Sequence, residues 1–308
     1  MNNNLFDNFD RDYLGPSSLL EPTYNFLNRS ARLSIERIRQ LLQSWFDRYP
    51  DDEKQEFASR FRMGSDGDID SPFFELYIHE FLLRNNYYPT VHPDIKNSSK
   101  KPDFLVLQDD EQKAYIEAVL ITGESDQEQK EQNRRDQLLD IINRAGANDF
   151  FFSISFIKTK EQQLSANRVI AFLKRKCSEI NPDELAEKVS KEGIDVLPTW
   201  IFEDNGWAIE FSPLPIKPES RGKKNIRPIG LSTSDFKFID SQKSIMNSLS
   251  KKAKKYGSFQ EPYVIAVNIT DPFAELIDVI QALYGDLKVS DSSEITLLGT
   301  NSGFWGDW

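Results

Sequence analysis

The stretch from residue 100 to 121 constrains the fold more than any other part of the chain. Two apolar runs, FLVLQ at 104–108 and AYIEAVLI at 114–121, are separated by a short polar segment. Runs of this length, rich in β-branched and aromatic residues, are typical of two strands joined by a turn. The pattern therefore predicts an antiparallel pair, with Asp103 at the entry of one strand and Glu117 within the other. The two carboxylates are then expected at the same end of a sheet.

Helical and extended patterns alternate along the rest of the chain. Residues 1–28 have the composition of an irregular leader, and Asn205-Gly206 between two apolar runs is typical of a β-hairpin turn. Apolar spacing, proline positions and capping residues predict the other elements. We expect helices at 33–46, 51–62, 72–86, 124–146, 165–176, 182–191, 241–255 and 272–284, and further strands at 87–92, 149–157 and 263–269.

This order of elements indicates an α/β fold in which helices flank a mixed β-sheet. We found neither an internal repeat nor a low-complexity linker, so the pattern favours one compact domain with an N-terminal helical part. The expected division is a leader and helices at 1–70, followed by an α/β domain at 71–308 that contains the Asn205-Gly206 hairpin and a basic segment.

Composition excludes several classes of protein. Hydrophobic residues make up 39% and aromatic residues 12% of the chain, which is typical of a globular protein and not of a disordered one. The single cysteine, Cys177, excludes an internal disulfide framework and a cysteine-rich zinc site. The chain shows no secretory signal and no apolar run of membrane-spanning length, so we expect a cytoplasmic protein.

Charge is distributed unevenly. The formal net charge is −11, yet residues 217–255 hold eleven Lys or Arg against three acidic residues. Such asymmetry is a weak indication of a surface that contacts phosphates, and a solvated loop and helix is the alternative interpretation. The residues expected to contact nucleic acid are Arg221, Lys223, Lys224, Arg227, Lys251 and Lys255.

Three carboxylates are candidates for a metal site. Asp103 and Glu117 are expected to be neighbours, and Glu75 lies on the helix ahead of the sheet. Carboxylate oxygens suit Mg²⁺ or Mn²⁺, and such an ion can activate water and neutralise charge on a phosphodiester. The alternatives are that Asp103 caps a turn, that Glu117 points to solvent and that Glu75 is an ordinary surface acid. His79 and His92 lack the spacing of a zinc motif and are interpreted as structural or substrate-side residues.

These residues carry a resemblance to a known group of enzymes. The PDF at 102–104 and the IEA at 116–118, preceded by Glu75 in FFELYIHEF, resemble the restriction-endonuclease-like PD-(D/E)XK nuclease superfamily. The resemblance implies a core of helix, three strands, helix and strand between about residues 70 and 160. It also implies that Asp103 and Glu117 hold the metal ion and that Glu75 assists. Segments nearer the C-terminus, such as RGKKNIRPIG, resemble uncharacterised bacterial proteins of this type.

The chain departs from that family at one position. Two residues after Glu117, where the family has a lysine, the chain has Val119. Either another element supplies the cation, or the site has lost hydrolysis and kept a binding role. The candidates for a relocated cation are Lys101, Arg134, Arg135 and Lys252. Lys252 is favoured, because its helix lies in the basic segment and precedes a predicted core strand.

The resemblance implies a metal-dependent endonuclease that cleaves DNA, or less favourably RNA, with defence against foreign nucleic acid as a context. The first alternative is a non-catalytic module that binds nucleic acid on a nuclease-like fold. The second is an interaction component of a larger defence assembly. A homodimer or a defence-complex partner is compatible with these hypotheses, which the sequence leaves open.

Overall fold

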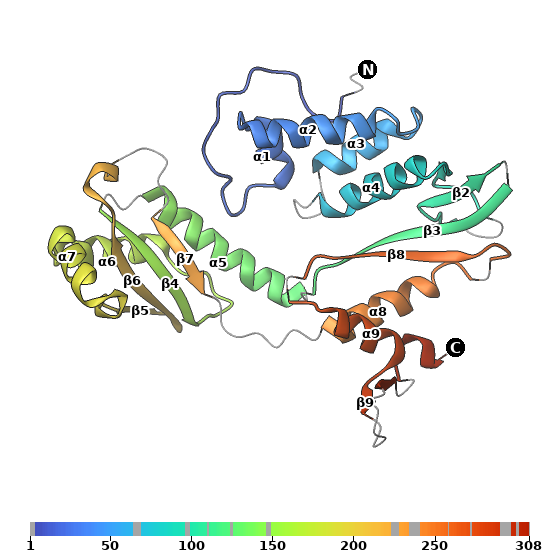
Figure 1. Cartoon of the computed structure of the whole chain (residues 1–308). Helices are drawn as coiled ribbons and strands as arrows, with labels where there is room; N and C mark the ends of the chain where they lie inside the picture. Colours follow the sequence, from blue (N-terminus) through green and yellow to red (C-terminus); the bar gives the residue numbers. More distant parts are fainter. Residues whose placement is uncertain are drawn as a thin grey trace. The chain divides into compact units, whose positions relative to one another are not determined.

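The structure is a computed structural model. It describes residues 4–63, 69–95, 99–109, 111–123, 126–145, 149–222, 228–233, 241–257, 259–271, 273–289, 297–299 and 302–307. The chain divides into two compact units (Figure 1), of which unit 1 comprises Met1–Leu14, Pro22–Glu124 and Ile239–Trp308 and unit 2 comprises Gly15–Glu21 and Ser125–Phe238. The expected division at residue 70 does not follow this grouping, because the N-terminal helices share a hydrophobic core with the strands that follow them.

Four helices precede the sheet of unit 1. They are α1 (Thr23–Arg29), α2 (Leu33–Phe46), α3 (Lys54–Met63) and α4 (Asp70–Arg84). The prediction of α2 is confirmed, whereas α1 lies in the segment interpreted as an irregular leader, since a seven-residue helix is too short to show a clear period. Helix α4 begins before Ser71, and Ile69 in the N-cap position makes no side-chain cap. The helix therefore begins two residues before the expected start at residue 72, and the preceding Ile69 is buried.

The sheet of unit 1 is mixed, and its strands lie in the order β1-β2-β3-β8. Strand β1 (Tyr88–Val91) pairs antiparallel with β2 (Phe104–Gln108), and β2 pairs antiparallel with β3 (Glu111–Ile121). Strand β8 (Tyr263–Ile269) runs parallel to β3. The predicted antiparallel pair is therefore confirmed, and its register places Phe104 opposite Ile116.

The helix and strand that complete this sheet come from much later in the sequence than expected. The resemblance placed them at 124–146 and 149–157, but these residues form α5 (Asp126–Ala145) and β4 (Phe150–Lys158) of unit 2. Helix α8 (Ser241–Ala253) and β8 complete unit 1 instead. The expected order of helix, three strands, helix and strand is therefore present as α4-β1-β2-β3-α8-β8, with unit 2 inserted between β3 and α8. Sequence periodicity does not reveal which strands pair, so it did not detect the insertion.

Helices cover both faces of this sheet (Figure 1). Aromatic residues of α2 and α3, among them Phe46 and Phe57, form one core with Phe104 and Val106 of the sheet. The opposite core combines alternate residues of β3 with residues of α8 and α9 (Leu276–Tyr284). This burial on both faces removes apolar surface from water and fixes the position of each strand end.

Unit 2 contains a second four-stranded mixed sheet, in the order β5-β6-β4-β7. Its other strands are β5 (Trp200–Asp204), β6 (Trp207–Pro215) and β7 (Ile229–Thr233), and its other helices are α6 (Ala166–Ser178) and α7 (Pro182–Glu192). Asn205 and Gly206 both have positive φ, as a two-residue hairpin turn of the primed type requires, so the predicted hairpin is confirmed. Its core combines phenylalanine and tryptophan side chains with leucine, isoleucine and valine.

The C-terminal part of unit 1 contains α9 and the two short paired strands β9 (Leu287–Val289) and β10 (Leu297–Gly299). The predicted start of the last helix, Pro272, lies outside the described residues, and α9 begins at Leu276 with a reciprocal capping box between Glu275 and Asp278. In the described part of the chain, no helix is both long and apolar enough to cross a membrane.

Candidate active site

Asp103 lies at the entry to β2, beside the neighbouring strand β3. Its Oδ2 accepts a hydrogen bond of 2.6 Å from the backbone N–H of Ala118, so the carboxylate is held across the strand pair. Burial and the nearby negative charge of Glu117 raise the pKa of Asp103 to about 6, although the Ala118 N–H and Lys252 act in the opposite direction. A partly buried carboxylate of this kind is stabilised in its charged form by a nearby cation.

Glu117 is buried, and only 1% of its surface is exposed. In β3 it alternates with Ile116, which packs against the core of the N-terminal helices, and shares the α8 side of the sheet with Val119. The interpretation of Glu117 as a solvent-facing residue is therefore wrong. An isolated carboxylate would be costly to bury in this position, so the partners that α8 and the following turn supply determine whether it is tolerated.

Three side chains from residues 252–256 surround the Glu117 carboxylate. Oε1 accepts hydrogen bonds of 2.7 Å from Nζ of both Lys252 and Lys255, and Oε2 accepts one of 2.5 Å from the hydroxyl of Tyr256. Burial is the largest single influence and favours the protonated acid, but these hydrogen bonds together hold the pKa of Glu117 below its ordinary value. Glu117 is therefore an ion-paired carboxylate within β3.

The structure brings Lys252 to the site whose expected lysine is missing. Val119 is buried in the core beneath α8 and carries no charge, whereas the side chain of Lys252 remains 29% exposed while its Nζ contacts Glu117. Among the other candidates, Lys101 pairs with Asp94, and only its backbone carbonyl contacts Tyr256. Arg134 and Arg135 belong to α5 in unit 2, where Arg135 pairs with Glu131.

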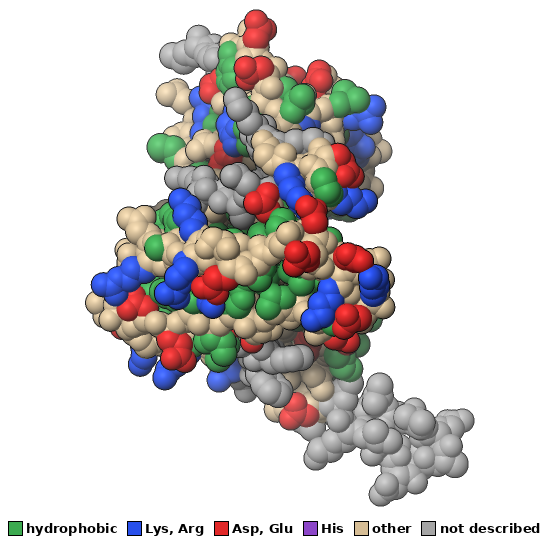
Figure 2. Space-filling model, turned by 90° about the vertical axis from the view of Figure 1, so that its left-hand side faces the viewer, with side chains coloured by type: hydrophobic (Ala, Val, Ile, Leu, Met, Phe, Trp, Pro, Cys, Tyr) green, Lys and Arg blue, Asp and Glu red, His purple; other side chains and the backbone are tan. Residues whose placement is uncertain are grey.

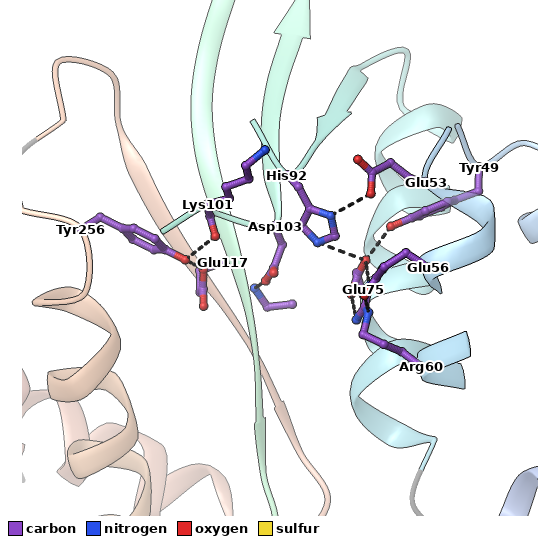
Figure 3. Close-up of polar contacts among 11 residues, drawn as sticks. Tyr49, Glu53, Glu56, Arg60, Glu75, His92, Lys101, Asp103, Glu117 and Tyr256 are labelled. Carbon is purple, nitrogen blue, oxygen red and sulfur yellow. Dashed lines mark hydrogen bonds and ion pairs between the residues drawn. The ribbon is translucent and has the colours of Figure 1, made fainter. Parts of the chain in front are cut away.

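Glu75 reaches the strand ends from the opposite layer of unit 1. It is 4% exposed, so the interpretation as an ordinary surface acid is wrong. Arg60 of α3 donates to both of its oxygens, at 2.7 and 3.0 Å, and the hydroxyl of Tyr49 donates to Oε1 at 2.5 Å. In Figure 3 Asp103 lies between Glu117 on the α8 side and Glu75 on the α4 side. Asp103 therefore has Glu117 on one side and Glu75 on the other, but the compact group of potential metal ligands there consists of Glu75, His92 and Asp103 and does not include Glu117.

Sequence reasoning missed several residues of this site. Tyr256, Tyr49 and Arg60 were not considered, and Tyr256 lies in the turn that follows the end of α8 at Ala253. His92 was treated as structural or substrate-side, and the structure places it beside Glu75 and Glu53 (Figure 3). No local pattern identifies Tyr49 or Arg60, because their partner is brought to them by the packing of α4.

The residues predicted to contact nucleic acid do not form one local group. Arg221 belongs to unit 2 and pairs with Asp183 at 2.6 Å, while Lys255 belongs to unit 1 and pairs with Glu117. Lys251 is exposed near the end of α8. Lys223, Lys224 and Arg227 lie outside the described residues. On the face drawn in Figure 2, basic and acidic side chains are interspersed.

The donor set at the strand ends fits a hard divalent cation. Asp103 and Glu117 offer carboxylate oxygens from adjacent strands, and Lys252 places a positive charge beside Glu117. Glu75 and Asp103 form a compact group of potential ligands with His92, and Glu117 lies outside this group. Such a group can bind a metal ion, hold a phosphate and orient water. The chain was also compared with known protein families, with curated proteins and with solved structures, and none of these comparisons found a match.

Proposed function

We propose that this protein is a metal-dependent nuclease of the restriction-endonuclease-like type, which hydrolyses phosphodiester bonds in DNA. The order α4-β1-β2-β3-α8-β8 supports the proposal, as does the position of Asp103 before β2 and of Glu117 within the paired strand β3. Asp103 and Glu117 would hold Mg²⁺ or Mn²⁺, and Glu75 would support them from α4. Both the chain's own chemistry and the sequence resemblance lead to this assignment.

The observation that carries the proposal is the contact of 2.7 Å between Nζ of Lys252 and Oε1 of Glu117. A nuclease of this type needs a cation beside its second acid, and in this sequence Val119 occupies the usual position. Lys252 supplies a positive charge beside the same carboxylate from α8, and its partial exposure leaves it accessible to a substrate phosphate. A lysine in this position stabilises the charge that develops on the phosphate during attack by water.

Each residue then has a defined task. A divalent ion, when bound by Asp103 and Glu117, supplies a water molecule of lowered pKa and neutralises charge on the phosphate. Tyr256 and Lys255 hold the Glu117 carboxylate in one orientation. The backbone N–H of Ala118 does the same for Asp103. Lys252 binds a non-bridging oxygen of the phosphate, while Arg60 and Tyr49 keep Glu75 directed towards the strand ends.

Cleavage assays with isosteric variants test the proposal. The purified chain is incubated with plasmid and single-stranded DNA in the presence of Mg²⁺, Mn²⁺ or EDTA. We expect cleavage that EDTA abolishes and that Asp103→Asn and Glu117→Gln each reduce at least a hundredfold. Glu111→Gln, at the exposed start of the same strand, is the matched control and keeps full activity. Folding is checked by circular dichroism, and folded Asp103 and Glu117 variants that still cleave at the original rate exclude the proposed site.

A second candidate function is supported by the hydrogen bonds that the Glu117 carboxylate already accepts. Both of its oxygens already accept hydrogen bonds from Lys252, Lys255 and Tyr256, as expected of a structural ion-pair cluster. In this interpretation the site has lost hydrolysis and the protein is a nucleic-acid-binding or interaction module. Salt-dependent DNA binding by fluorescence anisotropy, together with no cleavage in Mg²⁺ or Mn²⁺, would identify this second function.

A further inference from the structure

His92 lies where a nitrogen donor can join the carboxylates of the candidate site. His92 directly follows the last residue of β1, and its backbone N–H donates a hydrogen bond of 3.0 Å to the carbonyl of Asp103. The Nε2 atom is 3.9 Å from Oε1 of Glu75. One ligand atom from each of Glu75, His92 and Asp103 lies within 4.8 Å of the other two, a spacing that a single metal ion can bridge.

The opposite side of the ring is anchored. Nδ1 of His92 is 3.1 Å from Oε2 of Glu53. A carboxylate accepts hydrogen bonds, so this contact places the proton of a neutral imidazole on Nδ1 and leaves the lone pair on Nε2, facing Glu75 and Asp103. A carboxylate that holds the distal N–H of a histidine is the usual companion of a metal-binding imidazole, because it fixes the tautomer and the direction of the ring.

The charges around His92 are unbalanced in the described part of the site. Glu53, Glu56, Glu75 and Asp103 contribute four carboxylates, and Arg60 contributes one guanidinium, which contacts Glu56 and Glu75. A second grouping of Glu53, Glu56 and His92 meets the same 4.8 Å spacing, but its Glu56 side chain is 54% exposed. The set containing Asp103 is more buried and shares a residue with the proposed catalytic pair, so it is the better cation site.

We propose that Nε2 of His92 is a ligand, together with Asp103 and Glu75, for a divalent transition-metal ion. This inference rests on the proposed function, because it names the ion that the nuclease would use. An imidazole nitrogen favours transition metals such as Mn²⁺, Co²⁺ or Zn²⁺ over Mg²⁺, which prefers a shell made only of oxygen. Of the two ions named for the nuclease, a shell that includes His92 therefore favours Mn²⁺ over Mg²⁺, and Glu53 is a positioning residue that acts through His92.

Pulsed EPR on the full chain with one equivalent of Mn²⁺ tests the ligand directly. The chain contains two histidines, His79 and His92, so nitrogen modulation of the Mn²⁺ signal can be assigned by substitution. We expect a directly bound histidine nitrogen in the wild type and in His79→Gln, and none in His92→Gln. His92→Gln should also bind Mn²⁺ at least tenfold more weakly, with a much smaller change for Mg²⁺.

A variant of Glu53 tests which ring nitrogen of His92 binds the ion. Glu53→Gln should retain the nitrogen modulation and weaken Mn²⁺ binding about tenfold, because it disturbs only the orientation of the ring. Loss of the modulation in Glu53→Gln would instead place the ion on Nδ1 and overturn the proposal. Because circular dichroism shows whether each variant is folded, lost binding in a folded variant is not confused with unfolding.

The same measurements distinguish the inference from the proposed nuclease activity. Mn²⁺ that binds without nitrogen modulation, in a protein whose cleavage depends on Asp103, overturns the role of His92 and leaves the nuclease intact. Nitrogen modulation in a protein that cleaves no substrate supports the metal site and excludes the nuclease. If the wild type binds no Mn²⁺, His92 is only an ion-pair partner of Glu53 and Glu75, and the inference is overturned.

Discussion

Nζ of Lys252 lies 2.7 Å from Oε1 of Glu117, although 135 positions separate the two residues in the sequence. The contact joins the end of α8 to the middle of β3 and places a cation beside a buried carboxylate. It unites the two halves of unit 1 across the inserted residues of unit 2, and the proposed chemistry depends on it.

Replacing Lys252 by methionine tests the catalytic importance of this contact. We expect the rate of DNA cleavage to fall by about two to three orders of magnitude, because a positioned cation is removed from the developing phosphate charge. Lys254→Met is the matched control, since Lys254 is an exposed lysine two positions along the chain, and it should keep most of the activity. Single-turnover rates in Mn²⁺ measure both variants. Equal losses in the two would show that this segment acts only through its general charge.

Arg60 is expected to stabilise the fold through Glu75. Its removal in Arg60→Gln leaves the buried Glu75 carboxylate with fewer charged partners and should lower the free energy of unfolding by about 2–3 kcal/mol, because uncompensated buried charge is costly. Glu56→Gln removes only the ion pair between Arg60 and the exposed Glu56, and it should lower the free energy of unfolding by less than about 0.5 kcal/mol. Urea unfolding of the two variants measures the difference, and similar costs would contradict this assignment.

Because His79 is buried, we expect the protein to lose stability in acid. Its side chain is buried, and burial lowers its pKa to about 4 in the folded protein, below the ordinary 6.5 of the unfolded chain. The unfolded chain therefore binds more protons between these values, so stability is full above pH 6.5 and is lost as the pH falls towards 4. We expect about 2 kcal/mol of this effect at pH 5. The difference in unfolding free energy between pH 7 and pH 5 should shrink by that amount in His79→Gln but not in Tyr88→Phe, an exposed control.

Residues 126–238, which form nearly all of the larger segment of unit 2, are expected to be removable without unfolding unit 1. Both ends of the insertion converge on Asp271: the hydroxyl of Ser241 donates to its Oδ2 at 2.6 Å, and Gly123 packs against the same carboxylate. A short Gly/Ser linker in place of residues 126–238 should therefore span the gap at little cost in entropy. Circular dichroism and thermal unfolding should show a cooperative transition for the shortened chain. An aggregated or non-cooperative product would contradict the independence of the two units.

Gly123 itself should resist substitution. It has a φ of +76°, and a Cβ atom there would lie 2.5 Å from an oxygen of Asp271. Gly123→Ala should therefore lower stability by about 1–3 kcal/mol, through both the left-handed backbone and the close contact. Gly193→Ala, whose Cβ would meet no atom within 4 Å, isolates the backbone part of the cost. Thermal unfolding of both variants checks this, and equal shifts would mean that the contact with Asp271 contributes nothing.

Local patterns predicted most elements because their signals lie within a few residues. The period of α2, the paired apolar runs of β2 and β3 and the Asn205-Gly206 turn each result from side-chain spacing or backbone preference. Helix α1 was missed because seven residues show too little of a period. The same locality explains why α5 and β4 were mistaken for the helix and strand that complete the first sheet: spacing identifies a strand but not its partner.

The candidate site shows the same limit. From the sequence alone, Asp103 and Glu117 could be placed together, because a turn joins their strands and the register of an antiparallel pair follows from it. Lys252 was favoured over the other candidate cations, but only the folded structure shows that it contacts Glu117. The burial of Glu75 and its pairing with Arg60 and Tyr49 had no local signal, since all of these contacts cross between helices.

The sequence by itself determined the class of fold, the strand pair that carries the two acids and the absence of a lysine at position 119. Only the tertiary structure decided that Gly15–Glu21 and Ser125–Phe238 form a separate unit, that α8 brings Lys252 to Glu117 and that His92 lies beside Glu75. The physical reason is distance along the chain. Hydrogen-bonding and hydrophobic periods act over a few residues, whereas these contacts arise from the packing of two cores on opposite faces of one sheet.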